Sequence, residues 1–351
     1  MISLDALTDL RSHDFDTIID VRSPSEYFED HIPGAINLPV LDDEERARVG
    51  TIYKQESPFR ARKIGAALVF RNAAHHIETA LGDYDGRWKP LVYCWRGGQR
   101  SGSFAWMLRE IGWRAETIEG GYRSYRRLVV KELYEEPLRF RLVQLGGYTG
   151  TAKTELLPRL ESLGVQVLDL EGLARHRGSI LGDLGTPQPS QKSFESALAG
   201  TLARLDPGRL VLVEAESSKI GAVTLPPSIW SAMQKAPWIV VSAPLEARAR
   251  YLADAYADVL ADGDVLKSKL APLRRYRGHA VVDNWNSLAD AGDQVALCRS
   301  LAADHYDPSY DKSARSRGKR PAARVHTQEL SPAALDAVAE QIAAELQTIS
   351  T

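Results

Sequence analysis

One cysteine is followed by a loop of glycines and arginines, and this stretch is the best suited in the chain to nucleophilic chemistry. Cys94 follows the apolar run 91–93, and Ser101 precedes an apolar pattern of helical spacing. We therefore expect the cysteine at a strand–loop–helix junction, with Ser101 as the helix N-cap. Loop N–H groups, the helix N-terminus and nearby arginines favour thiolate over thiol, so the sulfur should be nucleophilic near neutral pH. The anion-binding loop around it would consist of Arg96, Gly97, Gly98, Gln99 and Arg100.

The alternative for Cys94 is a small thiol buried in the core, where free cysteines often lie. Two glycines and two arginines within the next six positions argue against it, because a core cysteine needs neither.

A second loop has the composition of a phosphate-binding loop. The strand candidate 139–145 runs into a glycine-rich segment that ends on Lys153 and Thr154 and opens a helix. Its N–H groups and lysine would bind phosphate oxygens, and the threonine hydroxyl would reach a metal or an oxygen. The predicted phosphate-binding residues are Gly147, Thr149, Gly150, Lys153 and Thr154.

Ala152 stands where this motif asks for glycine. If that position requires a positive φ, alanine costs on the order of 1 kcal/mol or more. The sequence therefore predicts phosphate binding more firmly than nucleotide hydrolysis.

Two glutamates are candidate acids for the phosphate loop. Glu214 and Glu216 end the apolar run 209–213, where P-loop proteins carry an acid directed at a metal. They could equally mark the exit of the strand to solvent. No His/Cys cluster has zinc spacing, so no metal site is predicted, and a need for Mg²⁺ stays open.

Composition describes a globular chain with more than one core. A length of 351 residues suggests about two domains, and 44% hydrophobic with 26% charged residues is typical of a soluble protein. The two cysteines, Cys94 and Cys298, lie far apart, and no basic segment with an apolar run opens the chain. We expect a cytoplasmic protein without disulfides, with Cys298 structural and with no membrane insertion.

The elements around the two loops suggest two α/β domains. A polar, helix-breaking stretch at 134–137 favours a boundary that gives domains 1–135 and 136–351. Strands alternate with helices after the phosphate loop, which predicts a mainly parallel sheet covered on both faces. A closing helix is expected after Ser331.

The first domain resembles a rhodanese domain. The residues that carry the resemblance are Asp20-Val21-Arg22, Glu26-Tyr27, the run 31–37 and the Cys94 loop closing on Arg100. The resemblance implies that Cys94 carries a persulfide, with the loop N–H groups cradling it or an oxyanion.

The chain as a whole resembles the bacterial tRNA 2-selenouridine synthase family. The strings 93–101, 50–54, 214–221 and 306–310 add to the two loops, and the resemblance covers nearly the whole chain. It implies a rhodanese-like α/β domain followed by a P-loop NTPase-like, kinase-like domain. The implied reaction replaces sulfur by selenium at the wobble 2-thiouridine of tRNA with selenophosphate. The family also transfers a geranyl group to that sulfur from geranyl diphosphate. No tightly bound cofactor is implied, and an enzyme that supplies selenophosphate would be a partner.

Contact with tRNA would have to come from local basic patches, because the net charge is only −2. Such residues could instead form solvated helix faces or a mobile loop. The candidates are Arg123, Arg126, Arg127, Arg274, Arg275, Arg277, Arg315, Arg317, Lys319 and Arg320.

Several assignments stay open at this level. Cys94 could attack the nucleobase, carry selenium as a perselenide or take up a departing thiol, and the phosphate loop could hold the prenyl diphosphate or selenophosphate. One alternative is a rhodanese-type sulfurtransferase fused to a kinase-like ATPase that acts on another acceptor. A second is a binding or regulatory protein with a vestigial P-loop. The sequence does not indicate which tRNAs are used or the oligomeric state.

Overall fold

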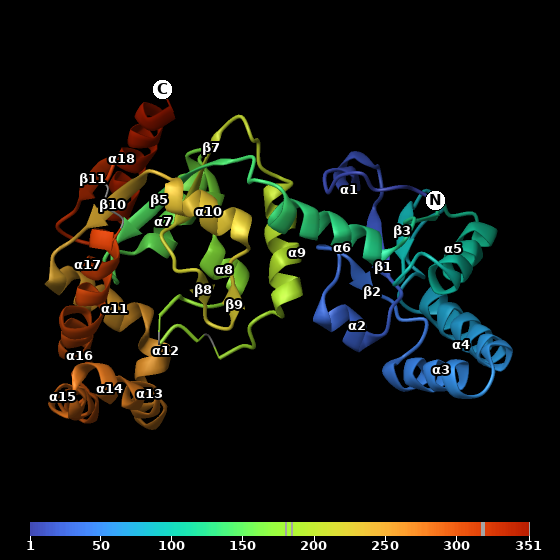
Figure 1. Cartoon of the computed structure of the whole chain (residues 1–351), viewed down its shortest axis with the longest axis horizontal. Helices are drawn as coiled ribbons and strands as arrows, with labels where there is room; N and C mark the ends of the chain where they lie inside the picture. The colour runs from blue at the N-terminus through green and yellow to red at the C-terminus, as the bar shows by residue number, and fades with distance from the viewer. Residues whose placement is uncertain (180, 184, 317–319, 351) are drawn as a thin grey trace. The chain divides into compact units, whose positions relative to one another are not determined.

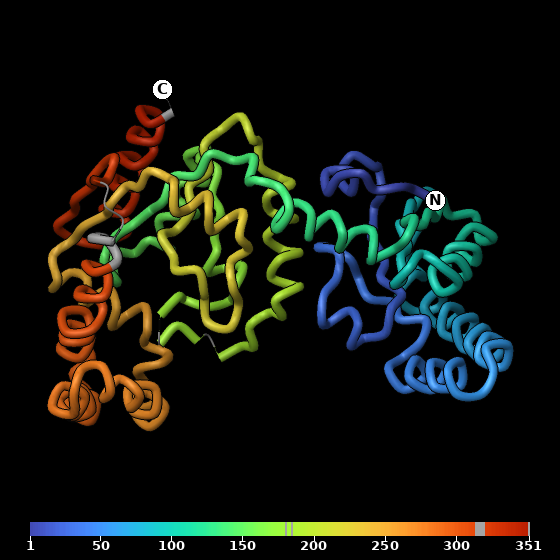
Figure 2. Tube along the Cα trace, viewed as in Figure 1, coloured from blue at the N-terminus to red at the C-terminus, as the bar shows by residue number. Residues whose placement is uncertain are grey.

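The chain folds into two compact α/β units, shown in Figure 1 as a computed structural model. It describes residues 1–179, 181–183, 185–316 and 320–350, without the side chains of 313–316 and 350. The first unit is Met1–Pro137 with Pro189–Arg204, and the second is Leu138–Gln188 with Leu205–Thr351. The sequence suggested one boundary near residue 136, whereas the chain returns to the first unit for one helix. Figure 2 allows this path to be followed along the trace.

The first unit is built on a four-stranded parallel sheet in the order β2-β1-β3-β4. Its elements are α1 (Asp9–Ser12), β1 (Thr17–Asp20), α2 (Pro24–Glu29), β2 (Ile36–Asn37), α3 (Asp43–Gln55), α4 (Pro58–Glu78), β3 (Pro90–Tyr93), α5 (Gln99–Ile111), β4 (Glu116–Thr117), α6 (Tyr122–Val130), η1 (Lys131–Glu135) and α9 (Gln191–Leu202). The central strand β3 is buried along its whole length, as its run of apolar residues predicts. Its carboxyl end delivers Cys94 to the edge of the sheet.

Helix α9 is held on the first unit by buried polar groups. The hydroxyl of Ser196 donates to Asp30 Oδ2 at 2.9 Å, and the hydroxyl of Tyr122 donates to the same oxygen. Glu195, itself buried, accepts hydrogen bonds from Arg126 and from the hydroxyl of Tyr134. These pairings explain why the segment 189–204 belongs to the first unit. Without α9, Asp30 and Arg126 would lose partners for their buried charges, and without them Glu195 would be buried unpaired.

The second unit contains a five-stranded parallel sheet in the order β11-β10-β5-β7-β6. The strands are β5 (Arg141–Gly147), β6 (Gln166–Leu168), β7 (Leu210–Glu214), the hairpin β8 (Lys219–Ile220) and β9 (Val223–Thr224), β10 (Trp238–Ser242) and β11 (Ala323–His326). The helices are α7 (Lys153–Ser162), α8 (Leu170–Ala174), α10 (Pro227–Lys235), α11 (Leu245–Ala255), α12 (Ala257–Leu260), α13 (Gly263–Leu270), η2 (Ala271–Leu273), α14 (Arg274–Arg277), α15 (His279–Asp290), α16 (Gln294–Leu301), η3 (Ala302–Tyr306), α17 (Asp307–Ser316) and α18 (Pro332–Ser350).

Two apolar clusters stabilise the second unit. The first packs α7 and α18 against the sheet, and it includes Leu156 and Ile342. The second lies among α11, α13, α15 and α16 and contains Trp285 and Cys298. The predicted α/β class with mainly parallel sheets is therefore confirmed. No helix of the described residues is long and apolar enough to cross a membrane.

The Arg126–Glu195 pair gives a test of how α9 is anchored. Glu195→Gln should lower the free energy of unfolding of the first unit by roughly 2–3 kcal/mol, because it removes a charged hydrogen-bond partner at a buried site. Urea unfolding followed by circular dichroism would measure the change. Glu161→Gln, at an exposed position of α7, is the matched control and should have almost no effect. Equal stabilities of the two variants would contradict this account of the anchor.

Candidate active site: a cysteine loop and a phosphate loop

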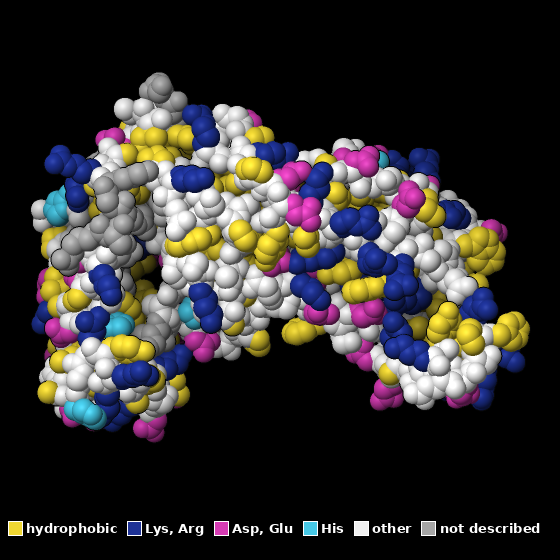
Figure 3. Space-filling view, viewed as in Figure 1, with side chains coloured by type: hydrophobic (Ala, Val, Ile, Leu, Met, Phe, Trp, Pro, Cys, Tyr) yellow, Lys and Arg dark blue, Asp and Glu magenta, His cyan; other side chains and the backbone are white. Residues whose placement is uncertain are grey.

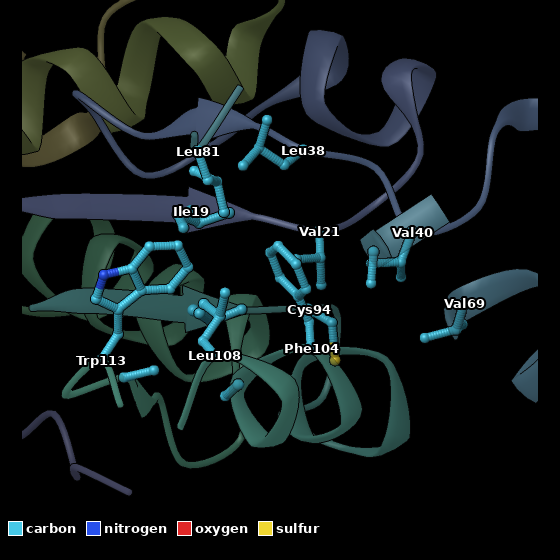
Figure 4. Packing of buried hydrophobic residues seen from close by; sticks show 14 of the residues in the cluster. Ile19, Val21, Leu38, Val40, Val69, Leu81, Cys94, Phe104, Leu108 and Trp113 are labelled. Carbon is cyan, nitrogen blue, oxygen red and sulfur yellow. The ribbon is translucent and has the colours of Figure 1, made fainter. Parts of the chain in front are cut away.

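Cys94 lies at the carboxyl end of β3 and is only 3% exposed. Figure 4 shows its side chain next to Val21 and Phe104, and it belongs to the hydrophobic cluster of the first unit. The sulfur therefore sits at the boundary between the apolar core and the polar loop that follows. The sequence analysis treated a buried core thiol and a loop thiol as alternatives for Cys94, whereas the structure combines the two.

The polar side of this boundary stabilises the thiolate. Burial raises the pKa of the Cys94 thiol, but hydrogen bonds from the Ser101 hydroxyl and from the N–H groups of Ser101 and Arg96, with the charge of Arg100, outweigh it and lower the pKa overall. The Ser101 hydroxyl donates to Sγ at 3.2 Å. A thiolate held in this way is a nucleophile near neutral pH.

The expected N-cap role of Ser101 is wrong. Helix α5 begins at Gln99 with Gly98 at the N-cap position, so Ser101 lies in the first turn and points its hydroxyl at the sulfur. The helix starts earlier than the apolar pattern suggested, because its first two residues, Gln99 and Arg100, are polar and lie outside the buried core.

The loop is fixed by close backbone contact with the turn at Gly120 and Gly121. Gly97 has φ +65°, and a Cβ there would lie 2.5 Å from the carbonyl oxygen of Ile118. Gly121 has φ +59°, and a Cβ there would lie 2.2 Å from the carbonyl oxygen of Cys94. Only glycine fits both positions. The sequence analysis missed Gly120-Gly121, although a glycine pair just before a helix is a recognisable signal for such a turn.

The two arginines of the loop have different roles. Arg100 forms an ion pair with Glu26 at 2.8 Å and is largely buried, so its charge stays beside the thiol. Arg96 is exposed, and its guanidinium makes no ion pair with the described residues. Gly98 and Gln99 are also exposed. Arg96 is therefore the loop cation that is free to meet an incoming anion.

The phosphate loop connects β5 to α7 in the second unit. Gly147 has φ +154° and Gly150 has φ +83°, and a Cβ at either would meet other atoms at less than 3 Å. The Lys153 ammonium donates to the carbonyl oxygen of Gly147 at 3.2 Å, which curls the loop around its own lysine. The predicted residues Thr149 and Thr154 line the cavity at this loop together with Gly150 and Lys153.

Ala152 adopts the left-handed conformation, with φ 56° and ψ 31°. This position therefore requires a positive φ, which explains why the motif prefers glycine there. The strain of about 1–2 kcal/mol is offset in part by the methyl group, since Ala152 is 3% exposed and packs in the core. The loop therefore keeps its left-handed conformation at this position although the residue is alanine and not glycine.

The outer side of the loop is held by α11 and α17. Arg248 is 4% exposed, pairs with Asp307 at 2.8 Å and donates to the carbonyl oxygen of Thr149 at 3.1 Å. Tyr148 donates to Asp311 at 2.6 Å. Asp307, which belongs to the string 306–310, therefore helps to hold the phosphate loop in place through Arg248.

Three glutamates gather beside Lys153 and Thr154. The Thr154 hydroxyl lies 3.4 Å from an oxygen of Glu171 and from one of Glu214. Burial raises the pKa of all three carboxyl groups, and mutual repulsion raises it further for Glu171 and Glu214, while Lys153 lowers it in part. Glu214 and Glu216 were expected here, whereas Glu171 was missed. The sequence did contain a signal for Glu171, because Asp169 and Glu171 directly follow the apolar residues of β6.

A cavity of about 400 Å³ opens at the phosphate loop. Besides the loop, its lining includes Glu171, Glu216, Arg177, Gly178, Tyr251 and Tyr256. It combines backbone N–H groups, one lysine and the carboxyl groups of Glu171 and Glu216, whose pKa values burial raises. Among the described residues, no group of three His, Cys, Asp or Glu is placed to hold a metal ion.

The structure separates the candidate basic residues into groups. Arg126 is paired with Glu195, Arg274 is paired with Asp283, and Arg277 donates to His305 and Ser309. Arg126 in particular is occupied inside the first unit and does not offer a free charge. Exposed side chains are those of Arg123, Arg127, Arg275 and Arg320. Arg317 and Lys319 lie outside the described residues, as does the side chain of Arg315.

Comparisons with known proteins match each of the two units. A family model described as a rhodanese-like domain matches residues 3–128, and one described as the tRNA 2-selenouridine synthase AAA domain matches residues 140–280. The chain is 38% identical to a tRNA 2-selenouridine synthase of Bdellovibrio bacteriovorus over 68% of its length, and 38% identical to one of Nitrosomonas europaea over 70%. It is 35% identical to one of Shewanella halifaxensis over 84% of its length.

These matches cover 64%, 65% and 87% of the three relatives, so the chain spans slightly less than two thirds of the length of the first two. Fold and site together define a rhodanese domain joined to a P-loop domain. The chain belongs to the tRNA 2-selenouridine synthase family.

The hydrogen bond from Ser101 predicts a measurable change in thiol chemistry. Ser101→Ala should raise the pKa of Cys94 and slow its alkylation by iodoacetamide at pH 7 several-fold, because the thiolate loses a donor. Rates measured against pH by mass spectrometry would give the pKa. Cys298 does not interfere, since burial raises its pKa to about 12. Ser103→Ala, two positions further along α5, should leave the profile unchanged, and an unchanged profile for Ser101→Ala would sink the assignment.

The glutamates predict that anion binding at the phosphate loop depends on pH. Their pKa values are raised, so they are protonated near neutral pH and add negative charge beside Lys153 as the pH rises. Affinity for inorganic pyrophosphate, measured by calorimetry, should therefore fall from pH 7 to pH 9.5, and Glu171→Gln should reduce that fall. Glu161→Gln, at an exposed position of α7 that does not line the cavity, is the control and should leave the fall unchanged. A fall that Glu171→Gln leaves intact would mean that this carboxyl does not control the site.

Proposed function

We propose that this protein converts the wobble 2-thiouridine of tRNA to 2-selenouridine with selenophosphate, through an S-geranylated intermediate formed from geranyl diphosphate. Family membership supports the tRNA substrate, and the relatives' printed names supply the product. The observation that carries the proposal is the Cys94 thiol, whose pKa is lowered although the residue is buried. A chain that only bound RNA would have no use for a thiolate so costly to bury.

The proposed chemistry has two steps. The thiocarbonyl sulfur attacks C1 of the geranyl group, so a C–S bond forms and a C–O bond breaks with release of diphosphate. The Cys94 thiolate then adds at C2 of the base, and the selenium of selenophosphate takes the place of the cysteine there. Geranylthiol leaves with a proton, and water cleaves the P–Se bond to release phosphate. S-alkylation makes the second step feasible, because a thiol departs more readily than a thiocarbonyl sulfur.

The two loops suit these two steps. The phosphate loop would hold the diphosphate of the prenyl donor through its N–H groups and Lys153, as both helix N-termini and P-loops bind such anions. Its protonated glutamates would leave the lysine charge available to the donor. Cys94 would act in the exchange step as the nucleophile that adds at C2 and is displaced there by selenium, while Arg96 meets the selenophosphate anion. This division assigns the anionic leaving group to one unit and the chalcogen to the other.

The direct test is to incubate the protein with 2-thiouridine tRNA, adding geranyl diphosphate and selenophosphate separately and together. Mass spectrometry of the digested nucleosides should show geranylated nucleoside with the first donor alone and selenouridine with both. Cys94→Ser should abolish selenium incorporation, and Lys153→Ala should lower geranyl transfer about tenfold or more, since it removes a charged contact to the diphosphate. Cys298→Ser, in the core of the second unit, should change neither step.

Three outcomes would contradict the proposal. Full selenium incorporation by the Cys94→Ser variant would remove the cysteine from the reaction. Thiosulfate sulfurtransferase activity together with ATP turnover in the absence of tRNA would favour a sulfurtransferase fused to a kinase-like ATPase. Tight tRNA binding without any change in the nucleosides would favour a binding protein.

A further inference from the structure

A groove of about 810 Å³ lies in the first unit among α3, α4 and α5. Gln99 and Arg100 line its end, so the groove adjoins the first turn of the helix that follows the Cys94 loop. Its apolar lining includes the buried side chains of Leu41 and Val69. Neither the sequence patterns nor the reaction described above assigns a role to this surface.

Positive charge dominates the lining of the groove. Four cations line it, namely Arg46, Arg62, Lys63 and Arg100, and no acidic residue of the described chain does. Glu26 lies behind two of them, 2.8 Å from Arg100 and 3.7 Å from Arg46, and neutralises part of their charge. Arg62 and Lys63 are exposed and make no ion pair among the described residues. The groove therefore has uncompensated charge that suits a polyanion.

Two aromatic rings stand exposed in the same groove. Tyr53, near the end of α3, is 55% exposed, and Phe59, in the first turn of α4, is 72% exposed. Figure 3 shows Lys and Arg side chains gathered beside hydrophobic ones on the visible face of the first unit. Rings left open to water next to unpaired cations are the combination that binds unstacked bases and the phosphates between them. A purely electrostatic site would not need the rings, and a purely apolar one would not need the cations.

We propose that this groove binds a short single-stranded segment of RNA, with bases stacked on Tyr53 and Phe59 and phosphates held by Arg62 and Lys63. A single strand is required, because bases paired within a helix cannot present their faces to the rings. The bound strand would run along α4 towards Arg100, so its next nucleotide would reach the Cys94 loop. The inference rests on the proposed function for the identity of the RNA, and it adds the site that positions the reacting nucleoside.

The test is binding of a fluorescent anticodon hairpin that carries 2-thiouridine at the wobble position, measured by anisotropy with the full chain. Phe59→Ala and Tyr53→Ala should each weaken binding about tenfold, the loss expected for one stacked base. Lys63→Ala should weaken it and reduce the slope of log affinity against log salt by about one. Phe28→Ala, at an 82% exposed ring outside the groove, and Lys54→Ala, on α3 but not in the lining, should match the unaltered protein.

Photo-crosslinking gives a second readout that a folding defect does not imitate. A hairpin with 5-iodouridine in the loop should crosslink to the peptide that contains Phe59, and a fully paired duplex should not. Thermal melting of each variant shows whether the first unit still folds.

Three results would overturn the inference. The first is equal hairpin affinity of the groove variants and their controls, and the second is crosslinking outside α3 and α4. The third is weaker binding of geranyl diphosphate to the groove variants with unchanged RNA affinity, which would make the groove a prenyl site. The proposed reaction fails separately. If the protein binds the hairpin in the groove but never alters its nucleoside, only the proposed reaction is contradicted. If Tyr53→Ala and Phe59→Ala leave nucleoside conversion unchanged, only the proposed RNA site is contradicted.

Discussion

The first unit depends on the buried guanidinium of Arg22. It is 1% exposed, pairs with Asp20 at 2.6 Å, donates to the carbonyl oxygen of Asp30 at 2.6 Å and lies 4.0 Å from the ring centre of Tyr122. One side chain thereby joins the end of β1, the end of α2 and the start of α6. Tyr122 in turn donates its backbone N–H to the carbonyl oxygen of Cys94 at 2.9 Å. The position of the thiol is thus linked, through Tyr122, to a buried charge whose partners come from several elements of the unit.

In the second unit, Arg248 plays a part similar to that of Arg22. This arginine is also buried, and it joins the phosphate loop to α17 through Thr149 and Asp307. In both units a loop with positive-φ residues carries the anion-binding groups: Gly97 in the Cys94 loop, and Gly147, Gly150 and Ala152 in the phosphate loop. The one strained residue among them is Ala152, and its conformation persists because surrounding contacts determine the shape of the loop. Rigid loops of this kind hold N–H groups in place before the anion arrives, which reduces the cost of binding.

Local features were predictable from the sequence, and features that depend on distant residues were not. The Cys94 loop and the phosphate loop were found because each motif is contiguous and its spacing reflects backbone geometry. The role of Ser101 was misassigned, since the apolar pattern marks where α5 meets the core and not where the helix begins. Glu171 comes together with Glu214 only when β6 pairs with β7. Arg126 was considered a surface residue because its partner, Glu195, lies 69 positions away along the chain.

The return of α9 to the first unit means that each unit is formed by two separate segments of the chain. A fragment ending at residue 137 would lack Ser196 and Glu195, leaving the carboxyl of Asp30 and the charge of Arg126 with fewer partners. Arg177 and Gly178, which precede α9 in the sequence, line the cavity at the phosphate loop. Cutting the chain at residue 137 therefore does not yield the complete first unit, because one of its helices lies within the sequence of the second.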